Sequence, residues 1–210
     1  MAVPDPLPLL AKSPVVPVLT IDDAKKAVPL AQALVAGGLP AIEVTLRTGA
    51  AIEAIRLIAQ NVPGAIVGVG TVTKPSDVEA AIRAGARYLV SPGTPAELAR
   101  ALAAARVPSI PGCATASEAM ALADLGFQVL KFFPAEAGGG IGWLKSIGGP
   151  LPDLRFCPTG GIDMKNAAAY LALPNVVAVG GSWVAPAAAV AAGDFGRVTT
   201  LAREAAALRA

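Results

Sequence analysis

The segment AIVGVGTVTKPSDVEAAIRAGARYLVSP, residues 65–92, contains the alternation that decides the fold. It opens with a Val- and Ile-rich run, 65–72, of the kind found in strands. A helix-start pattern follows at Ser76, a helix-stop glycine at Gly85, and a second apolar run at 87–92. A strand, a helix and a strand in this order predict two parallel strands joined by a crossover helix.

The same alternation extends along the whole chain. Eight runs are predicted as strands: 15–20, 40–47, 65–72, 87–92, 107–112, 128–134, 154–158 and 175–181. Alanine-rich stretches between them predict helices, three of which have a capping-box pattern beginning at Ser76, Thr94 and Thr115. Eight strand–helix units imply an α/β fold of the closed (β/α)8 TIM-barrel type, with its active site at the carboxyl ends of the strands.

An open doubly wound sheet is the alternative architecture. It usually has fewer strands, and no G-x-G-x-x-G pattern opens the first helix. No linker or low-complexity segment divides the chain. We therefore expect one domain, 1–210, in which residues 1–13 are an N-terminal extension.

Composition and charge exclude several classes of protein. The net charge is +2 and only 15% of residues are charged, with no basic stripe, so nucleic acid is not an expected partner. The longest uncharged run, 166–193, is interrupted by Pro174, Pro186 and a glycine pair, so no membrane span is predicted. The first residues lack the pattern of a signal peptide, which favours the cytoplasm.

Histidine is absent from the sequence. Acid–base chemistry must therefore fall to Glu, Asp, Lys, Tyr or Cys, and a histidine-ligated metal site is excluded. The two cysteines, Cys113 and Cys157, are separated and do not make a zinc site, and a disulfide between them is not expected in a reducing compartment. We expect no metal and no cofactor.

The predicted strand at 40–47 has one apolar and one polar face. Side chains alternate along a strand, so Glu43, Thr45 and Arg47 share the face that would point into the barrel. Neither face of a barrel strand meets solvent, so these residues belong either to an active site or to an internal salt bridge. Arg47, at the end of the strand, can hold a carboxylate with two hydrogen bonds, or it is an ordinary surface arginine.

The run VLKFFPAE, 129–136, places Lys131 among apolar residues. Its strand would lie across the barrel from Glu43. One interpretation is a buried ion pair that orders the core. The other is an amine that forms a Schiff base with a ketone, with a carboxylate nearby to move protons.

Glycines mark three further positions. Thr71 follows Gly68 and Gly70, which allow close approach of substrate or backbone; its alternative role is an ordinary strand-end threonine. The triplets Thr159-Gly160-Gly161 and Gly180-Gly181-Ser182 follow the last two predicted strands, where barrels of this kind bind phosphate. Together with Lys131, they predict a phosphorylated keto acid as substrate and Schiff-base carbon–carbon bond chemistry.

These motifs resemble those of the 2-keto-3-deoxy-6-phosphogluconate (KDPG) aldolase and 4-hydroxy-2-oxoglutarate aldolase family. The matching blocks are PVVPV (14–18), EVTLRT (43–48), GVGTV (68–72), SPG (91–93), PG (111–112), KFFPAE (131–136), FCPTGGI (156–162) and GGSW (180–183). They occur in the family's order from about residue 14 to the C-terminus. The resemblance is specific because eight blocks fall in sequence at compatible spacing.

The resemblance implies a cytoplasmic class I lyase of the Entner–Doudoroff pathway, an aldehyde-lyase without a cofactor and typically a homotrimer. Such an enzyme cleaves KDPG to pyruvate and glyceraldehyde 3-phosphate. Members often also cleave 4-hydroxy-2-oxoglutarate to pyruvate and glyoxylate.

The resemblance also assigns roles to residues. Lys131 would form the Schiff base and Glu43 would transfer protons, while Arg47 and Thr71 would hold the pyruvyl carboxylate and Phe133 would flank the imine. The residues implied at the phosphate end are Thr159, Gly160, Gly161, Gly181 and Ser182.

Three other functions remain open from the sequence. A 2-keto-3-deoxy-6-phosphogalactonate aldolase gives the same products from the substrate of opposite C4 configuration. A phosphosugar epimerase would use carboxylates and not need Lys131, and a phosphate-binding barrel would not need to bury a lysine and a glutamate. Small departures from the family at 68–70, 112–115 and 137–140 leave the activity on unphosphorylated substrates open.

Overall fold

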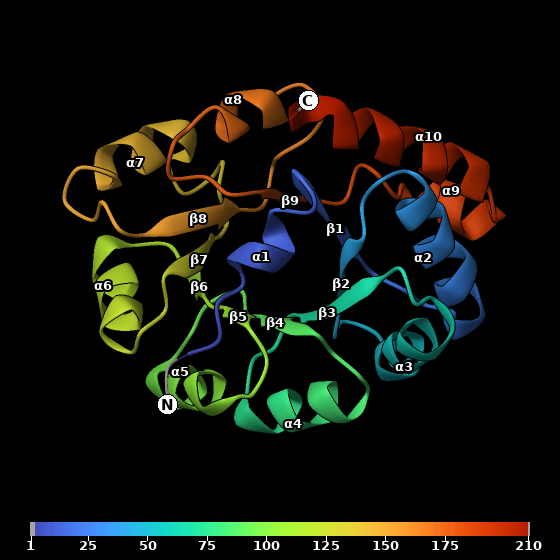
Figure 1. Ribbon diagram of the computed structural model, residues 1–210, viewed down its shortest axis with the longest axis horizontal. Helices are drawn as coiled ribbons and strands as arrows, with labels where there is room; N and C mark the ends of the chain where they lie inside the picture. Colours follow the sequence, from blue (N-terminus) through green and yellow to red (C-terminus); the bar gives the residue numbers. More distant parts are fainter. Residues whose placement is uncertain (1–2, 210) are drawn as a thin grey trace.

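Short parallel strands alternate with helices in the computed structural model, which describes residues 3–209 (Figure 1). The strands are β1 Val15–Leu19, β2 Ala41–Thr45, β3 Ile66–Gly70, β4 Tyr88–Val90, β5 Ser109–Ile110, β6 Gly112–Cys113, β7 Val129–Phe132, β8 Arg155–Pro158 and β9 Val179–Gly181. The α-helices are α1 Leu7–Leu10, α2 Ala27–Ala36, α3 Ala51–Asn61, α4 Pro75–Arg83, α5 Ala96–Ala104, α6 Ala116–Asp124, α7 Gly140–Ile147, α8 Ala167–Leu171, α9 Ala187–Ala192 and α10 Phe195–Ala206. Two short 3₁₀ helices, Ala24–Lys26 and Ala207–Arg209, complete the elements.

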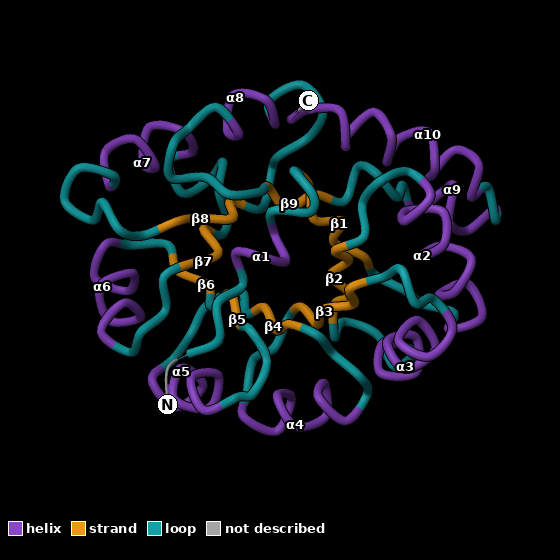
Figure 2. The backbone as a smooth tube through the Cα atoms, in the orientation of Figure 1, coloured by secondary structure: helices purple, strands orange, loops and turns teal. Residues whose placement is uncertain are grey.

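The strands pair in parallel in two groups. One has the order β5-β4-β3-β2-β1-β9 and the other β6-β7-β8. In this register Glu43 lies beside Gly68 of β3, and Lys131 lies beside Gly112 of β6. Figure 2 shows the strands around a common centre, with α1 inside the ring and the other helices outside it. The chain is therefore a single α/β domain with a curled parallel sheet.

The predicted strand at 107–112 is divided into β5 and β6. Pro111 lies between them, and proline has no N–H to donate to a neighbouring strand. Its carbonyl still accepts a hydrogen bond from the backbone N–H of Lys131, at 2.9 Å. One predicted strand thus appears as two short segments for a local chemical reason.

On the other side of the ring, β8 and β9 do not form a continuous ladder. Two isolated parallel bridges join this part of the chain, Phe156 with Val176 and Thr159 with Gly180. The second bridge places Thr159, the first residue after β8, beside Gly180 of β9. The two glycine triplets found in the sequence therefore lie next to each other.

The core has two parts. The larger lies between strands and helices and includes Ile42 and Val44 of β2, as the alternation along that strand predicts. The smaller lies inside the ring and includes Tyr88 and Val90 of β4. Leu10 of α1 is fully buried in this inner cluster, and α1 crosses the centre of the ring in Figure 1. Because α1 precedes β1, it covers the end from which the parallel strands start and leaves their carboxyl ends open.

One of the three predicted capping boxes is present. At the start of α6 the backbone N–H of Glu118 donates to Thr115 Oγ1 at 3.2 Å, and that of Thr115 donates to Glu118 Oε2 at 3.0 Å. The other two predictions are wrong. Helix α4 begins at Pro75 with Lys74 as its N-cap, two residues before the predicted cap Ser76, so Asp77 accepts the N–H of Lys74 instead. The hydroxyl of Thr94 donates to the backbone carbonyl at the start of β6 and does not cap α5.

The long uncharged run at 166–193 folds into α8, β9 and α9. Its two prolines, Pro174 and Pro186, fall between these elements, as the sequence predicts, whereas Gly180 and Gly181 lie within β9. No helix in the part of the chain that the structure describes is long and apolar enough to cross a membrane.

Candidate active site

A lysine and a glutamate meet inside the ring. The Nζ atom of Lys131 on β7 donates to Oε1 of Glu43 on β2, at 3.2 Å. The two residues are 4% and 3% exposed. Because β2 and β7 belong to different groups of strands, this contact crosses the interior. The geometry matches the prediction that the two side chains reach each other from opposite strands.

Gly68 and Gly70 of β3 make room for side chains of the protein itself. A Cβ atom at Gly70 would lie 2.1 Å from Oε1 of Glu43, and one at Gly68 would lie 2.2 Å from the ring of Tyr88. The interpretation that these glycines admit the substrate is therefore incomplete, because neighbouring side chains take up the space above both.

Tyr88 was not singled out from the sequence. It is fully buried, and its hydroxyl has no hydrogen-bond partner among the described residues. Burial, with a smaller contribution from the negative charge of Glu43, raises the pKa of Tyr88 well above its ordinary value. The phenol of Tyr88 therefore stays neutral near Glu43, and the side chain fills space without adding a charge.

The ends of β2 and β3 bring Arg47 and Thr71 together. The Nε atom of the exposed Arg47 donates to Thr71 Oγ1 at 3.2 Å. Thr71 has φ 60°, a left-handed conformation that costs a non-glycine residue about 1–3 kcal/mol. Thr45, on the same face as Glu43, donates its hydroxyl to the carbonyl of Leu19 at 2.9 Å and so ties β2 to β1.

Phe133 links the lysine to the first glycine loop. Its ring centroid lies 5.4 Å from Nζ of Lys131, within the range of a cation–π contact. A Cβ atom at Gly160 would lie 3.3 Å from the same ring. The ring of Phe133 therefore lies between the Lys131 amine and the loop that contains Gly160.

The loops after β8 and β9 present unpaired backbone donors. Gly160 and Gly161 have φ of 102° and 78°, which glycine adopts readily. Within residues 3–209, no protein acceptor is found for the N–H groups of Gly161 and Ser182, whereas Gly160 adjoins the bridge between Thr159 and Gly180. Ser182 is exposed, whereas Thr159 is buried. Adjacent free N–H groups form an anion-binding concavity.

The second glycine pair is also constrained by packing. A Cβ atom at Gly180 would lie 2.2 Å from Thr159 Oγ1, and one at Gly181 would lie 1.7 Å from the indole ring of Trp183. Gly181 is itself buried. Glycine is thus required at both positions by neighbouring side chains, which the sequence pattern alone does not reveal.

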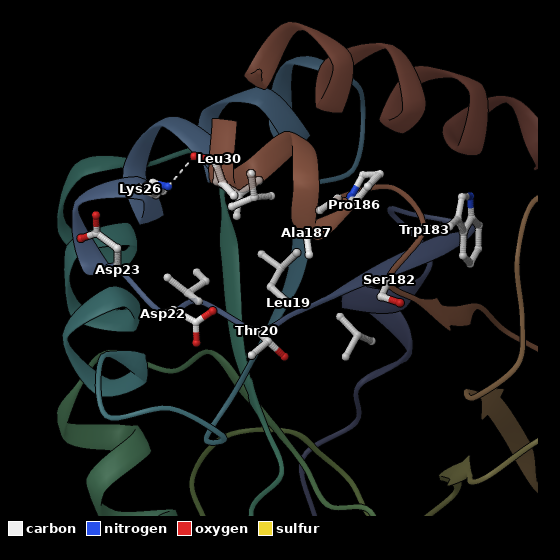
Figure 3. Close-up of a pocket in the computed structure, with 15 residues that line it drawn as sticks. Leu19, Thr20, Asp22, Asp23, Lys26, Leu30, Ser182, Trp183, Pro186 and Ala187 are labelled. Carbon is white, nitrogen blue, oxygen red and sulfur yellow. Dashed lines mark hydrogen bonds between the residues drawn. The ribbon is translucent and has the colours of Figure 1, made fainter. Parts of the chain in front are cut away.

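A cavity of about 520 Å³ lies beside the loop after β9 (Figure 3). The end of β1 and the residues around Asp22 form one wall, and Ser182 with α9 forms the other. The side chain of Lys26 joins the two walls, because its Nζ atom donates to the carbonyl of Ala191 on α9 at 2.8 Å. Neither Lys131 nor Glu43 lines this cavity, so the buried pair lies outside it.

The cysteines take no part in a disulfide. Cys113 and Cys157 are both buried, and burial raises the pKa of each thiol to about 12. In residues 3–209 no group of three or more Cys, Asp or Glu side chains is placed to hold a metal ion. The chemical groups described above are an amine and a carboxylate inside the ring, and a guanidinium and backbone N–H groups where strands end.

Comparisons with known proteins agree over almost the whole chain. Residues 8–201 match the family model for KDPG and KHG aldolase. The 2-dehydro-3-deoxy-phosphogluconate aldolase of Dickeya dadantii is 53% identical, with 94% of this chain and 92% of that protein covered. The KHG/KDPG aldolase of Escherichia coli K12 is 51% identical at the same coverage.

Solved structures give the same result. The crystal structure of KDPG aldolase from Legionella pneumophila, with pyruvate captured as a covalent carbinolamine intermediate, has a TM-score of 0.94 and 44% identity. It covers 97% of this chain and 98% of its own. A native KDPGal structure is more distant, at 27% identity and a TM-score of 0.83 with 94% of each chain covered. On the strength of the family match and these identities, the chain belongs to the KDPG and KHG aldolase family.

Proposed function

We propose that this protein is a class I aldolase that cleaves KDPG to pyruvate and glyceraldehyde 3-phosphate in the Entner–Doudoroff pathway. The observation that carries the proposal is the buried contact between Lys131 Nζ and Glu43 Oε1, at 3.2 Å, in a chain of this family. A carboxylate at this distance can take a proton from the lysine and leave an amine that attacks a ketone.

The reaction begins at C2 of the substrate. The amine of Lys131 attacks the ketone, and loss of water gives a protonated imine, which withdraws electrons from the adjacent carbons. Glu43, directly or through a water molecule, removes the proton of the C4 hydroxyl. The C3–C4 bond then breaks, its electrons move into the imine, and glyceraldehyde 3-phosphate leaves. Protonation of the resulting enamine and hydrolysis of the imine release pyruvate and free Lys131.

The two ends of the substrate have different partners. Arg47 and Thr71 bind the pyruvyl carboxylate, because their side chains meet at 3.2 Å where β2 and β3 end. Phe133 flanks the imine, since its ring lies 5.4 Å from Lys131 Nζ. The phosphate binds the free N–H groups of Gly161 and Ser182 and lies against Gly160, and Thr159 and Gly181 support the two loops from within.

A related activity fits the same site. An aldolase that holds the pyruvyl end by Arg47 and Thr71 also accepts 4-hydroxy-2-oxoglutarate, which lacks the phosphate. The phosphogalactonate aldolase is the less favoured alternative, because the KDPGal structure is 27% identical whereas KDPG aldolases reach 53%.

We infer that the two groups of strands close into one eight-stranded (β/α)8 barrel. The bridges between β8 and β9, and the continuity of β5 and β6 through Pro111, support this inference. We also propose one domain, 1–210, with 1–13 as its N-terminal extension. A homotrimer and a cytoplasmic location follow from the family resemblance, and analytical ultracentrifugation tests the first.

Borohydride reduction tests the function directly. The protein is incubated with pyruvate and sodium borohydride, and the modified peptide is found by mass spectrometry. An adduct on Lys131 alone is the expected result, with the exposed Lys145 of α7 as the internal control. A folded protein without an adduct would overturn the Schiff-base mechanism and favour an epimerase or a binding protein. Cleavage assays with KDPG and its C4 epimer then separate the two aldolases.

A further inference from the structure

Glu136, the last residue of KFFPAE, makes a contact that the mechanism above does not use. The hydroxyl of Tyr170 donates to Glu136 Oε1. Tyr170 lies on α8 and is fully buried, whereas Glu136 lies in the exposed turn after β7. The bond therefore connects the turn that follows the lysine strand with a helix 34 residues further along the chain.

Glu136 also contacts the first glycine loop. Its backbone N–H donates to the carbonyl of Gly160 at 3.1 Å. A Cβ atom at Gly161 would lie 2.6 Å from Cγ of Glu136, so the stem of the glutamate lies directly against this glycine. Glu136 therefore contacts both residues of the Gly160–Gly161 loop, one through its backbone and the other through its side chain.

The same loop is held from its other side by α8. Nδ2 of Asn166 donates to the carbonyl of Gly161 at 3.0 Å, and Oδ1 of Asn166 accepts the N–H of Asp163 at 2.9 Å. Asn166 and Tyr170 are four residues apart, so both face the loop from one side of the helix start. The loop that contains Gly160 and Gly161 is therefore held by Asn166 on one side and by Glu136 on the other. The Tyr170–Glu136 hydrogen bond connects these two sides.

The Tyr170–Glu136 hydrogen bond also sets the direction of the Glu136 carboxylate. A free carboxylate beside Gly161 would repel a phosphate. Burial of Tyr170 and its bond to Glu136 raise the pKa of the phenol above its ordinary value, so the hydroxyl remains a donor at neutral pH. The carboxylate is therefore directed toward α8.

From these contacts we infer that Tyr170 and Glu136 are positioning residues that fix the Gly160–Gly161 N–H groups for the substrate phosphate. They thereby set the preference for phosphorylated over unphosphorylated keto acids. This inference rests on the proposed function. It goes beyond it by assigning specificity to a contact that touches neither the substrate nor the lysine.

Three variants test the contact. Tyr170→Phe removes the donor, Glu136→Ala removes both the acceptor and the stem against Gly161, and Glu136→Gln keeps the stem and an accepting oxygen. For Tyr170→Phe and Glu136→Ala we expect the KM for KDPG to rise about tenfold, since hydrogen bonds to charged groups are among the stronger ones. Their kcat should change less than about twofold, and Glu136→Gln should stay close to the parent protein.

The matched readout uses a ligand without phosphate. The pyruvate concentration that gives half-maximal borohydride adduct on Lys131 should be unchanged in all three variants, and so should the KM for 4-hydroxy-2-oxoglutarate where that substrate is cleaved. Glu79→Gln on α4, an exposed carboxylate paired with Arg83 at 3.5 Å, is the control substitution.

The outcomes distinguish this inference from the proposed function. Equal losses for KDPG and pyruvate would show that the contact is only structural, and unchanged kinetics would show that it is dispensable; either result overturns the inference. If the parent protein itself forms no pyruvate adduct, the proposed function fails first. Thermal melts confirm folding, and Glu136→Ala, in an exposed turn, decides the matter if Tyr170→Phe does not fold.

Discussion

The two ends of the proposed site are built in different ways. The proposed pyruvyl end consists of side chains on strands, Lys131 and Glu43, which meet in the interior at 3.2 Å. The proposed phosphate end consists of backbone N–H groups in two loops, around Gly161 and Ser182. Strand alternation fixes the direction of a side chain, so the first end is visible in the sequence. A free N–H group depends on what surrounds the loop, so the second is visible only as glycines.

The two ends should also differ in how they respond to substitution. At the proposed pyruvyl end, side chains would carry the chemistry, and Gly70 makes room for Glu43. At the proposed phosphate end, the glycine loop would carry the function, and Glu136 contacts it through its side chain and its backbone N–H. Substitutions at the first end should therefore change kcat, and those at the second should change the KM for phosphorylated substrates.

Lys131→Ala should have the largest effect. Without the amine no imine forms, so kcat/KM for KDPG should fall by about 10⁴-fold or more, as for other covalent nucleophiles. Steady-state kinetics and borohydride trapping measure the loss, with Lys145→Ala as control. Retained cleavage would place the nucleophile elsewhere. Because Glu43 then loses its buried partner, a thermal melt must accompany the assay.

Glu43→Gln should have the second largest effect. The amide keeps the shape of the carboxylate but cannot accept a proton, so kcat should fall by about 10³-fold. Lys131 remains, and prolonged incubation with pyruvate and borohydride should still give an adduct. A variant with full cleavage activity would leave the Lys131–Glu43 contact as a structural ion pair only.

Gly161→Ala should break the phosphate end alone. The residue has φ 78°, and its new Cβ would meet Cγ of Glu136 at 2.6 Å, so the loop must move. We expect the KM for KDPG to rise about tenfold or more, with pyruvate trapping unchanged. Gly142→Ala on α7 is the control, because a Cβ there meets nothing within 4 Å. Equal loss for both ligands would contradict a division into two ends.

Ser182→Ala should have a smaller effect at the same end. The exposed hydroxyl is removed but the backbone N–H remains, so the KM for KDPG should rise about fivefold, the equivalent of one hydrogen bond. Ser146→Ala on α7, whose hydroxyl bonds only the carbonyl of Gly142, is the matched control. An unchanged KM would restrict the phosphate site to backbone donors.

Thr115→Ala should alter stability and not kinetics, because Thr115 belongs to neither end of the proposed site. Loss of this helix cap should lower the free energy of unfolding by about 1 kcal/mol, measured by urea denaturation. The N–H of Ala114, then Thr115, lower the pKa of Glu118 below its ordinary value of 4.5. The carboxylate therefore stabilises the fold above that pH, and the benefit is lost as the pH falls through the folded value. Glu118→Gln should accordingly destabilise the protein at pH 7 and have no effect in strong acid.

Much of the fold was predictable because strands and helices are local. Each of the eight predicted strands contains a strand of the structure. The one with Pro111 is divided, since a proline cannot donate to its neighbour, and of 175–181 only the last three residues form β9. The capping boxes were less predictable. Two of three were wrong, because the position of one proline and the distant partner of Thr94 decided which residue caps each helix.

The sequence by itself determined the family, the alternation of strands and helices, and the residue types that carry the chemistry. A lysine in an apolar run and a glutamate on the polar face of a strand are local patterns. Tertiary structure decided which of them meet and why. The contact of Lys131 with Glu43, the ring of Tyr88 over Gly68, and the hold of Tyr170 and Glu136 on the glycine loop all join distant segments. Local sequence sets the direction of each side chain, but only the packed sheet sets the distance between them.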